Sequence, residues 1–370
     1  MKYYILAGEA SGDLHGSNLI KALLEEDKNA DIRFWGGDLM KSAGGTLVKH
    51  YKERAFMGFS EVIMNLNKIF KLISFCKNDI TSFNPDVVIF IDNSGFNLRI
   101  AKWAKAAGLK TNYYISPQVW ASRASRVKAI KRDIDGMYVI LPFVKPFYEK
   151  YNYNVTFVGH PLIDAIANRK QVEEFKFRDK HKLSNKPIIA LLPGSRKQEI
   201  TKMLSVMLSL VDDYPDYQFV IAGAPSQEYD FYKTFIKSSN VKFIANKTYD
   251  LLSISTAALV TSGTATLETA LFKVPQVVCY KGSSISYFIA KRIITLKYIS
   301  LVNLIMNREV VTELIQSDFN QKKLKIELDK IVDKNSREQM FLDYFELEKA
   351  LGGKGASKKT AQLIYNGIKN

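Results

Sequence analysis

The chain has 370 residues, 47% of them hydrophobic, and this combination excludes a disordered chain and predicts two domains. Its net charge of +16 predicts an anionic partner: nucleic acid, an anionic membrane surface or a phosphorylated substrate. The basic residues form no long run and no nucleic-acid-binding motif, so no nucleic acid is expected. Lysines merely scattered over a soluble surface are the simpler alternative. Neither a signal peptide nor a membrane span is expected, and Cys76 and Cys279 match no metal or redox spacing.

Short apolar runs alternate with helical patterns along the chain. The apolar runs predict buried strands at residues 2–7, 86–91, 110–115, 136–141, 187–192, 217–222, 241–245, 257–261 and 275–280. Helices are predicted at residues 17–26, 60–78, 98–107, 199–211 and 264–271. This alternation predicts an α/β fold with doubly wound sheets.

The strand–helix pattern restarts near residue 186, after the polar stretch "HKLSNKP". We therefore expect two Rossmann-like domains, residues 1–165 and 166–344, with the C-terminal helices at about 345–370 rejoining the first. Ligands of such sheets bind outside the carboxyl ends of the strands, so the loops at those ends are the candidate sites.

The first such loop is "GEASGDLHG", residues 8–16. It lacks the Gly-x-Gly-x-x-Gly pattern of dinucleotide-binding sites, so nicotinamide binding is not expected. Its glycines would let the backbone approach a ligand, and Ser11 or Asp13 could cap the next helix. A tight turn with a helix cap is the simpler alternative, but it leaves Glu9 and His15 without a role.

Two further loops follow strands of the first domain. Asp92 ends an otherwise apolar strand, where partial burial would raise its pKa and suit it to be a general base. A cap for a helix beginning near Leu98 is the alternative. Gln118 and Trp120, in "SPQVWASR", suit hydrogen bonding and stacking on a sugar ring, although for this loop taken alone a core tryptophan beside a turn is the favoured interpretation.

Two loops of the second domain are suited to bind a nucleotide. Gly194, Ser195 and Arg196 begin a helix, whose free N–H groups and positive end favour a diphosphate. The segment 262–264, "SGT", could hold a phosphate or a ribose, and Glu268 could accept hydrogen bonds from two ribose hydroxyls. A cluster of small residues that simply starts a helix is the alternative.

Residues 54–77 and 285–307 combine large apolar side chains with lysine or arginine. Such stretches can lie in a membrane interface or hold an acyl chain, and buried core helices look similar. In the first stretch, Phe70 belongs to the expected core stripe, whereas Leu72 and Phe75 are among the apolar residues left over, with Met57, Phe59 and Met64.

Taken together, nine stretches resemble the lipid-A-disaccharide synthase family of bacterial glycosyltransferases. They are "GEASGD", "MGFSEV", "ID…FN", "SPQVWASR", "FVGHPLID", "LLPGSRKQEI", "SGTATLE", "AKR…KYISLVNL" and "ELIQ", in the family's order from residue 8 to residue 316. The chain departs from the family at Asn93 and Ser94, where Ala-Pro is common, and at Val302, where Pro is common. Asp92 and Asn303 are retained.

The resemblance implies the GT-B fold, in which two Rossmann-like domains face a cleft. It implies transfer of 2,3-diacylglucosamine from UDP-diacylglucosamine to the 6-hydroxyl of diacylglucosamine 1-phosphate, with inversion to a β linkage. It assigns Asp92 as the base. It assigns the nucleotide sugar to Gly194, Ser195, Arg196, Ser262, Gly263, Thr264, Glu268, Asn303, Glu313 and Gln316. It assigns the acceptor to Glu9, Ser11, Gly12, Gln118 and Trp120.

The resemblance further implies a cytoplasmic protein bound peripherally to the anionic inner membrane of a Gram-negative bacterium. A homodimer is left open. No metal and no cofactor are expected, since no acidic cluster is found and Arg196 with a helix end can stabilise the leaving UDP. The alternatives are a UDP-sugar epimerase or lipid II transferase, which share the fold but not "GEASGD" or "SPQVWASR", and a non-enzymatic basic membrane-binding protein.

Overall fold

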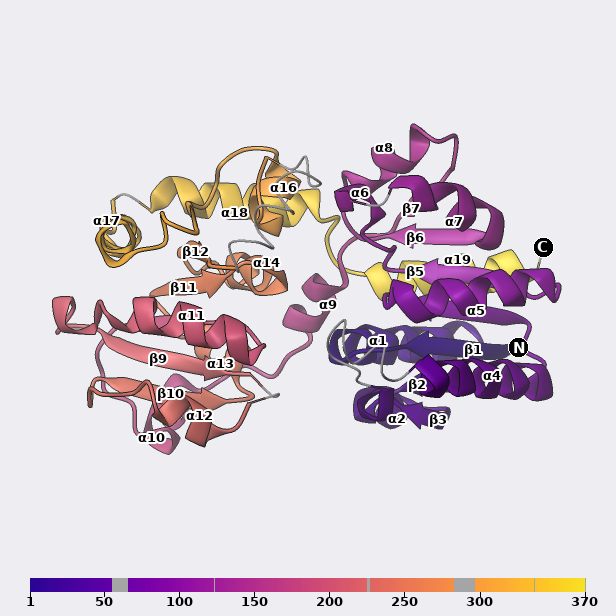
Figure 1. Ribbon diagram of the computed structural model, residues 1–370, viewed down its shortest axis with the longest axis horizontal. Coiled ribbons are helices and arrows are strands. Elements are labelled where there is room, and N and C mark those ends of the chain that lie inside the picture. The colour runs from indigo at the N-terminus through magenta and orange to yellow at the C-terminus, as the bar shows by residue number, and fades with distance from the viewer. Residues whose placement is uncertain (55–65, 123, 225–226, 283–296, 336, 370) are drawn as a thin grey trace. The chain divides into compact units, whose positions relative to one another are not determined.

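The computed structural model describes residues 1–54, 66–122, 124–224, 227–282, 297–335 and 337–369 (Figure 1). It divides into two compact units. Unit 1 comprises Met1–Asp164 and Leu351–Asn370, and unit 2 comprises Ala165–Ala350.

Unit 1 is built on a parallel sheet of seven strands in the order β3-β2-β1-β4-β5-β6-β7. The strands are β1 (Lys2–Ala7), β2 (Asp31–Gly36), β3 (Thr46–His50), β4 (Val87–Ile91), β5 (Lys110–Tyr114), β6 (Gly136–Val139) and β7 (Thr156–Phe157). Its α-helices are α1 (Ala10–Glu26), α2 (Asp38–Ala43), α4 (Leu66–Phe83), α5 (Ser94–Ala106), α6 (Val119–Ser122), α7 (Val127–Asp133), α8 (Val144–Glu149), α9 (Pro161–Ala167, which ends in unit 2) and α19 (Ala356–Lys369). Short 3₁₀ helices lie at Tyr51–Arg54 and Ala124–Arg126.

Helices cover both faces of this sheet, which is why its central strands are apolar at every position. On one face, Leu19 and Leu23 of α1 and Ile364 of α19 pack in one cluster with Ile5 and Ile89 of the sheet. On the other face, Tyr4 of β1 donates from its hydroxyl to Asp79 of α4, 2.6 Å away. The last helix of the chain therefore closes the core of unit 1 beside the first, as the yellow α19 in Figure 1 shows.

Unit 2 repeats the plan with a parallel sheet of six strands in the order β10-β9-β8-β11-β12-β13. The strands are β8 (Ile188–Leu192), β9 (Gln218–Gly223), β10 (Val241–Ala245), β11 (Ala257–Thr261), β12 (Gln276–Tyr280) and β13 (Glu313–Ile315). Its α-helices are α10 (Glu174–Lys180), α11 (Lys197–Leu208), α12 (Tyr229–Lys233), α13 (Thr248–Leu252), α14 (Thr264–Leu271), α16 (Leu301–Met306), α17 (Gln321–Val332) and α18 (Glu338–Ala350), with a 3₁₀ turn at Val211–Asp213. Met203 and Met207 of α11 and Leu324 and Leu328 of α17 pack on one face of the sheet.

All nine predicted strands are confirmed, and β2, β3, β7 and β13 were not predicted. Two helices begin at least four residues earlier than expected. The helix predicted at 17–26 begins at Ala10, so seven of the nine residues of "GEASGDLHG" are helical rather than a turn. The helix expected near Leu98 begins at Ser94. Both helices therefore start directly after the strands that precede them.

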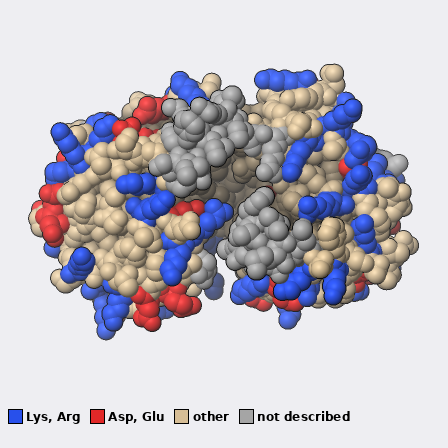
Figure 2. Space-filling model, in the orientation of Figure 1, with Lys and Arg blue, Asp and Glu red and all other residues tan. Residues whose placement is uncertain are grey.

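The surface of both units is rich in lysine and arginine. Figure 2 shows these side chains spread over the face in view, with acidic side chains in smaller groups between them. Many surface charges are paired locally, as in Arg178 with Glu174 and Lys323 with Asp318. None of the helices in the described ranges combines the length and the hydropathy needed to cross a membrane.

Candidate functional site

Asp92 lies at the carboxyl end of β4 in a tightly fixed backbone. It and Asn93 both adopt left-handed conformations, with φ of 46° and 43°. The Asp92 carbonyl accepts hydrogen bonds from the Tyr113 hydroxyl and from Nδ2 of Asn97, the latter at 2.9 Å. The Asn93 side chain packs closely on Gly8, since a side-chain carbon at Gly8 would lie 1.9 Å from Nδ2 of Asn93. The turn that presents the Asp92 carboxyl is thus held from β1, β5 and α5.

The carboxyl group of Asp92 is poised to take up a proton near neutral pH. Burial is the main cause that raises its pKa to about 6, and the negative charge of Glu9 raises it further. The backbone N–H of Asn93 opposes the shift in part. A carboxylate with this pKa is largely ionised at pH 7 and basic enough to accept a proton from a hydroxyl as it attacks.

The first loop is used for packing more than was expected. Glu9 is the N-cap residue of α1 and is exposed, and Ser11 lies exposed in the first turn of that helix. Gly12 is buried, and a side-chain carbon there would lie only 3.2 Å from Cβ of Ala7. The need for glycine at position 12 is therefore close contact between α1 and β1. His15 is buried in α1, where burial lowers its pKa to about 4.

Asp13 does not cap the helix that contains it. Its carboxylate accepts hydrogen bonds from the backbone N–H groups of Gly37, Leu39 and Met40, at 2.7, 3.1 and 3.0 Å. It therefore caps α2, and the expectation that it caps the following helix is wrong. Gly37 and Met40 lie in the segment that follows β2, a strand that the sequence did not reveal.

The loop after β5 contains the other two predicted acceptor residues. Gln118 is exposed, and Trp120 is half-buried in α6 with its ring edge-on to Phe143 at 4.8 Å between centroids. Ile115 adopts φ of 67°, which is strained for a β-branched residue. Its N–H donates to the Tyr138 carbonyl at 3.1 Å. This hydrogen bond fixes the start of the loop. Strained backbone of this kind is often found at functional sites.

In unit 2, the loops after β8 and β11 come together. Gly194 follows β8 with φ of 103°, a conformation that favours glycine. A side-chain carbon there would lie 2.9 Å from Oε2 of Glu199 and 3.6 Å from Cγ2 of Thr261, the last residue of β11. The beginnings of α11 and α14 are therefore neighbours, and both present free N–H groups at the same edge of the sheet.

Arg196 is the N-cap residue of α11, and its side chain is 77% exposed. Its Nη1 lies 3.1 Å from Oε1 of Glu199, and its backbone N–H donates to Oε2 of the same carboxylate at 3.3 Å. An exposed ion pair of this kind contributes little to stability. Arg196 can therefore leave Glu199 for an anionic ligand at little cost. Ser195, beside it, is also exposed.

At the start of α14, Ser262 already has a structural partner. Its hydroxyl donates to the Ile299 carbonyl at 2.9 Å. Gly263 and Thr264 are exposed, and a side chain at Gly263 would enter open space. Oε1 of Glu268 accepts a hydrogen bond from the Tyr249 hydroxyl at 2.6 Å. Burial raises the pKa of Glu268, and the Tyr249 hydrogen bond opposes that rise.

Asn303 and Glu313 hydrogen-bond to each other and to nearby backbone groups, and do not form an open binding surface. The Asn303 amide donates to Glu313 and to the Val311 carbonyl and accepts from the N–H groups of Val310 and Val311, all within 3.0 Å. Glu313 also accepts from the N–H groups of Ile299 and Ser300 at 2.9 Å. All four hydrogen-bonding positions of the Asn303 amide are used, so Asn303 fixes the segment that follows α16, and Glu313 fixes the segment before it.

Gln316 follows β13 with φ of 56°, and its N–H donates to the Tyr280 carbonyl at 2.8 Å. Its Nε2 is buried, and no hydrogen-bond acceptor lies within reach among the described residues. A buried amide without a partner is costly, which marks Gln316 as a group that a ligand could satisfy. The segment 283–296, with Lys291 and Arg292 of the second amphipathic stretch, lies outside the described residues.

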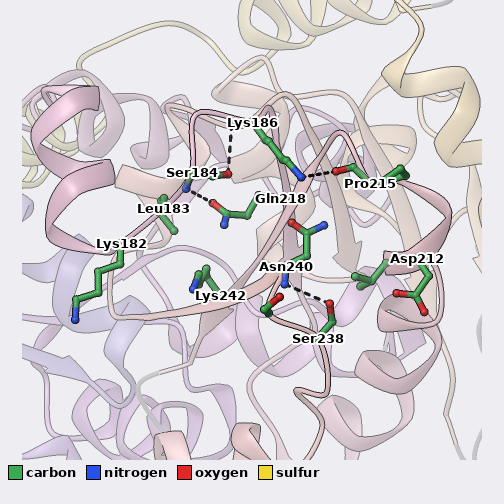
Figure 3. Close-up of a pocket in the computed structure, with 12 residues that line it drawn as sticks. Lys182, Leu183, Ser184, Lys186, Asp212, Pro215, Gln218, Ser238, Asn240 and Lys242 are labelled. Atoms are coloured by element: carbon green, nitrogen blue, oxygen red, sulfur yellow. Dashed lines mark hydrogen bonds between the residues drawn. The ribbon is translucent and has the colours of Figure 1, made fainter.

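A cavity of about 580 Å³ lies at the opposite edge of the same sheet, near the amino ends of β8, β9 and β10 (Figure 3). Several of its polar groups are already engaged. Lys186 donates to the Pro215 carbonyl at 2.6 Å, and Gln218 accepts from the Ser184 N–H at 2.9 Å. Because ligands of parallel sheets bind at the carboxyl edge, this cavity is not the candidate nucleotide site.

No group of three or more His, Cys, Asp or Glu side chains is arranged for a metal ion in the parts of the chain that the structure describes. The side chains of Cys76 and Cys279 are both buried. Tyr113, Asn97 and Tyr249, which position the predicted site residues, were missed from the sequence. Only Asn97 carried a signal, as the last residue of "ID…FN".

Comparison with known proteins gives one consistent family. The family model described as lipid-A-disaccharide synthetase matches residues 3–366. The lipid-A-disaccharide synthase of Geobacter metallireducens is 37% identical over 367 residues, covering 97% of this chain and 95% of that protein. That of Syntrophus aciditrophicus is 38% identical over 379 residues, covering 99% and 97%.

Solved structures show a similar fold at low sequence identity. The UDP-GlcNAc 2-epimerase of Neisseria meningitidis, bound to UDP-GlcNAc, matches with a TM-score of 0.69 and 14% identity over the full length of both chains. The glycotransferase of kitacinnamycin matches with a TM-score of 0.66 and 12% identity, covering 99% of this chain and 98% of that one. At such identities the likeness shows the fold alone.

Proposed function

The chain belongs to the lipid-A-disaccharide synthase family and has the GT-B fold, and we propose that it transfers 2,3-diacylglucosamine from its UDP derivative to the 6-hydroxyl of 2,3-diacylglucosamine 1-phosphate. Family membership makes it a glycosyltransferase of lipid A biosynthesis, and its relatives come from Gram-negative bacteria. The observation that most directly supports the proposed chemistry is Asp92, whose carboxyl group is carried on a fixed turn at the carboxyl edge of unit 1 and has a pKa of about 6.

We assign the acceptor to the carboxyl edge of unit 1. Asp92 would remove the proton from the attacking 6-hydroxyl, because its carboxyl is the group in that turn with a raised pKa. Glu9 and Ser11 are exposed beside the same strand ends and would bind the acceptor sugar, with Gln118 and Trp120 on the loop after β5. In this role, Gly12 acts through the packing of α1 on β1.

We assign UDP to the carboxyl edge of unit 2. The N–H groups at the starts of α11 and α14, with Ser195, Gly263 and Thr264 exposed there, would hold the diphosphate. Arg196 would exchange Glu199 for the β-phosphate and stabilise the negative charge that develops as UDP leaves. Gln316 would donate to the ligand from Nε2, which has no acceptor among the described residues, and Glu268 would accept from the ribose. Asn303, Glu313 and Ser262 would fix the loop around the nucleotide.

These roles describe direct displacement with inversion and require no metal ion. One carboxylate takes the acceptor proton, the acceptor oxygen bonds to the anomeric carbon, and the bond to UDP breaks with its electrons on the phosphate oxygen. The products are the β-1,6-linked disaccharide 1-phosphate and UDP. Mass spectrometry of a reaction containing both acylated substrates tests this, since a product carrying both glucosamine units is expected only if the transfer occurs.

We also propose that the described part of the first amphipathic stretch contacts an anionic membrane. A cavity of about 340 Å³ in unit 1 is lined by Lys49, Glu53, Lys68, Lys71, Leu72 and Phe75. Phe70, expected in the core, is instead 65% exposed, and Phe75 is 49% exposed. Apolar side chains beside lysines suit the boundary between lipid headgroups and acyl chains. Met57, Phe59 and Met64 of this stretch lie outside the described residues.

A further inference from the structure

Tyr249 and Glu268 come from different helices at the carboxyl edge of unit 2. Tyr249 lies in α13, which follows β10, and Glu268 lies in α14, which follows β11. The Tyr249 hydroxyl donates to Oε1 of Glu268 at 2.6 Å. A short hydrogen bond to a partly buried carboxylate is among the stronger ones in proteins. It fixes which way the Glu268 carboxylate faces.

The ring of Tyr249 is itself held by the helix that carries Glu268. It packs on Phe272 with ring centroids 5.3 Å apart, and Phe272 is the C-cap residue of α14. The guanidinium of Arg169 also lies over the ring of Phe272, 4.7 Å from the ring centroid. Tyr249 thus contacts α14 at two points one helical turn apart, and its hydroxyl has little freedom to move away from Glu268.

The hydrogen bond leaves Glu268 with one oxygen for a ligand. In the described structure, Oε1 is taken by Tyr249 and Oε2 accepts no hydrogen bond. From the sequence, Glu268 was expected to accept hydrogen bonds from two ribose hydroxyls. With Oε1 engaged by Tyr249, only Oε2 is left to accept from the ribose. Burial disfavours the charged form of Glu268 and the Tyr249 hydroxyl favours it, so the tyrosine also helps to keep that oxygen a strong acceptor.

We propose that Tyr249 is a positioning residue that directs the free oxygen of Glu268 at a ribose hydroxyl of the nucleotide, and so makes the site selective for ribonucleotides over deoxyribonucleotides. The inference rests on the proposed function, because it takes UDP as the ligand of unit 2. A site built to hydrogen-bond a hydroxyl rejects the analogue that lacks it, since the buried acceptor is then left unpaired.

Calorimetric titration of UDP, 2′-deoxy-UDP and 3′-deoxy-UDP into the wild-type chain and Tyr249→Phe tests the proposal. The wild-type chain is expected to bind UDP about tenfold or more tightly than at least one deoxy analogue. Tyr249→Phe is expected to lose affinity for UDP alone, so that the preference falls to about threefold or less. A tyrosine that only stabilised the fold would weaken all three ligands alike, and that result overturns the proposal.

Tyr214→Phe is the matched control. Its hydroxyl also donates to a carboxylate at 2.6 Å, that of Asp329, in the same unit but on a turn before β9. This variant is expected to keep the wild-type preference. If it loses the preference as Tyr249→Phe does, the effect is not specific to the contact with Glu268 and the proposal fails.

Glu268→Ala provides a second variant should Tyr249→Phe not fold. It removes the carboxylate and with it the free acceptor for the ribose hydroxyl. The preference for UDP is expected to be lost, and an unchanged preference overturns the proposal. If the wild-type chain binds UDP and both analogues equally, the ribose role of Glu268 fails while UDP remains the ligand. If it binds no UDP, the proposed function itself fails, and the inference with it.

Discussion

Nη1 of Arg196 lies 3.1 Å from Oε1 of Glu199, in a capping arrangement that holds the guanidinium at the start of α11 until a stronger anion replaces the carboxylate. Arg196 is largely exposed and Glu199 is one-third exposed, so water weakens their Coulomb attraction, whereas a diphosphate would offer Arg196 bidentate, charge-assisted hydrogen bonds. This relationship predicts a residue that matters for binding but not for folding.

Arg196→Ala is expected to weaken UDP binding by about 2–3 kcal/mol and to leave the melting temperature nearly unchanged. Titration calorimetry and thermal unfolding measure the two quantities. Lys242→Ala is the matched control, since it removes a positive charge from the cavity at the other edge of the same sheet. Equal UDP affinity in Arg196→Ala and the wild-type chain would show that the diphosphate binds elsewhere.

Asp92→Asn is expected to lower turnover by about 10²–10⁴-fold while UDP still binds, because the base acts on the acceptor and not on the nucleotide. Asp86→Asn, just before the amino end of β4, is the control and should retain turnover. Steady-state rates and UDP titrations of both variants decide the matter. Near-normal turnover in Asp92→Asn would move the base to another group, with Glu9 and His15 the next candidates.

The acidic limb of the rate profile is expected to follow the ionisation of Asp92. A base must be deprotonated to act, so the rate should rise with pH through about 6, the raised pKa of Asp92. Glu9→Gln removes a charge that raises this pKa, and the limb should move to lower pH. Glu25→Gln, at the far end of α1, should leave it in place. A limb that does not move with Glu9→Gln would contradict the coupling between Glu9 and Asp92.

Phe70→Ser is expected to reduce co-sedimentation with anionic vesicles and to leave the melting temperature nearly unchanged, because this ring is 65% exposed. Phe175→Ser in unit 2 removes a ring that is 83% exposed and tests whether any exposed phenylalanine has the same effect. Equal loss of vesicle binding in both variants would argue against a membrane surface centred on α4.

The central strands could be predicted because their apolar runs are continuous, and helix-covered parallel sheets bury both faces of such runs. β2 was not predicted because Asp31 and Arg33 interrupt its run of apolar residues. Arg33 pairs with Asp79 of α4, and that partner becomes a neighbour only in the fold. β13 has only three residues, too few for a pattern.

The candidate site could be predicted as positions but not as contacts. Asp92 was marked by its place after an apolar strand, whereas the Tyr113 and Asn97 bonds that hold it depend on neighbouring strands and on α5. Asn303 was marked by resemblance alone, and its contact with Glu313 shows why an amide suits that position. No local pattern could have paired Tyr249 with Glu268, since the two belong to different helices.

The most direct test of the central claim is UDP release from UDP-2,3-diacylglucosamine, measured with and without 2,3-diacylglucosamine 1-phosphate. The account predicts release that depends on the phosphorylated acceptor and matches the disaccharide formed one for one. Release at the same rate without the acceptor would contradict the transfer. So would conversion of the donor sugar to its 2-epimer, which would place the chain with the epimerases whose fold it shares.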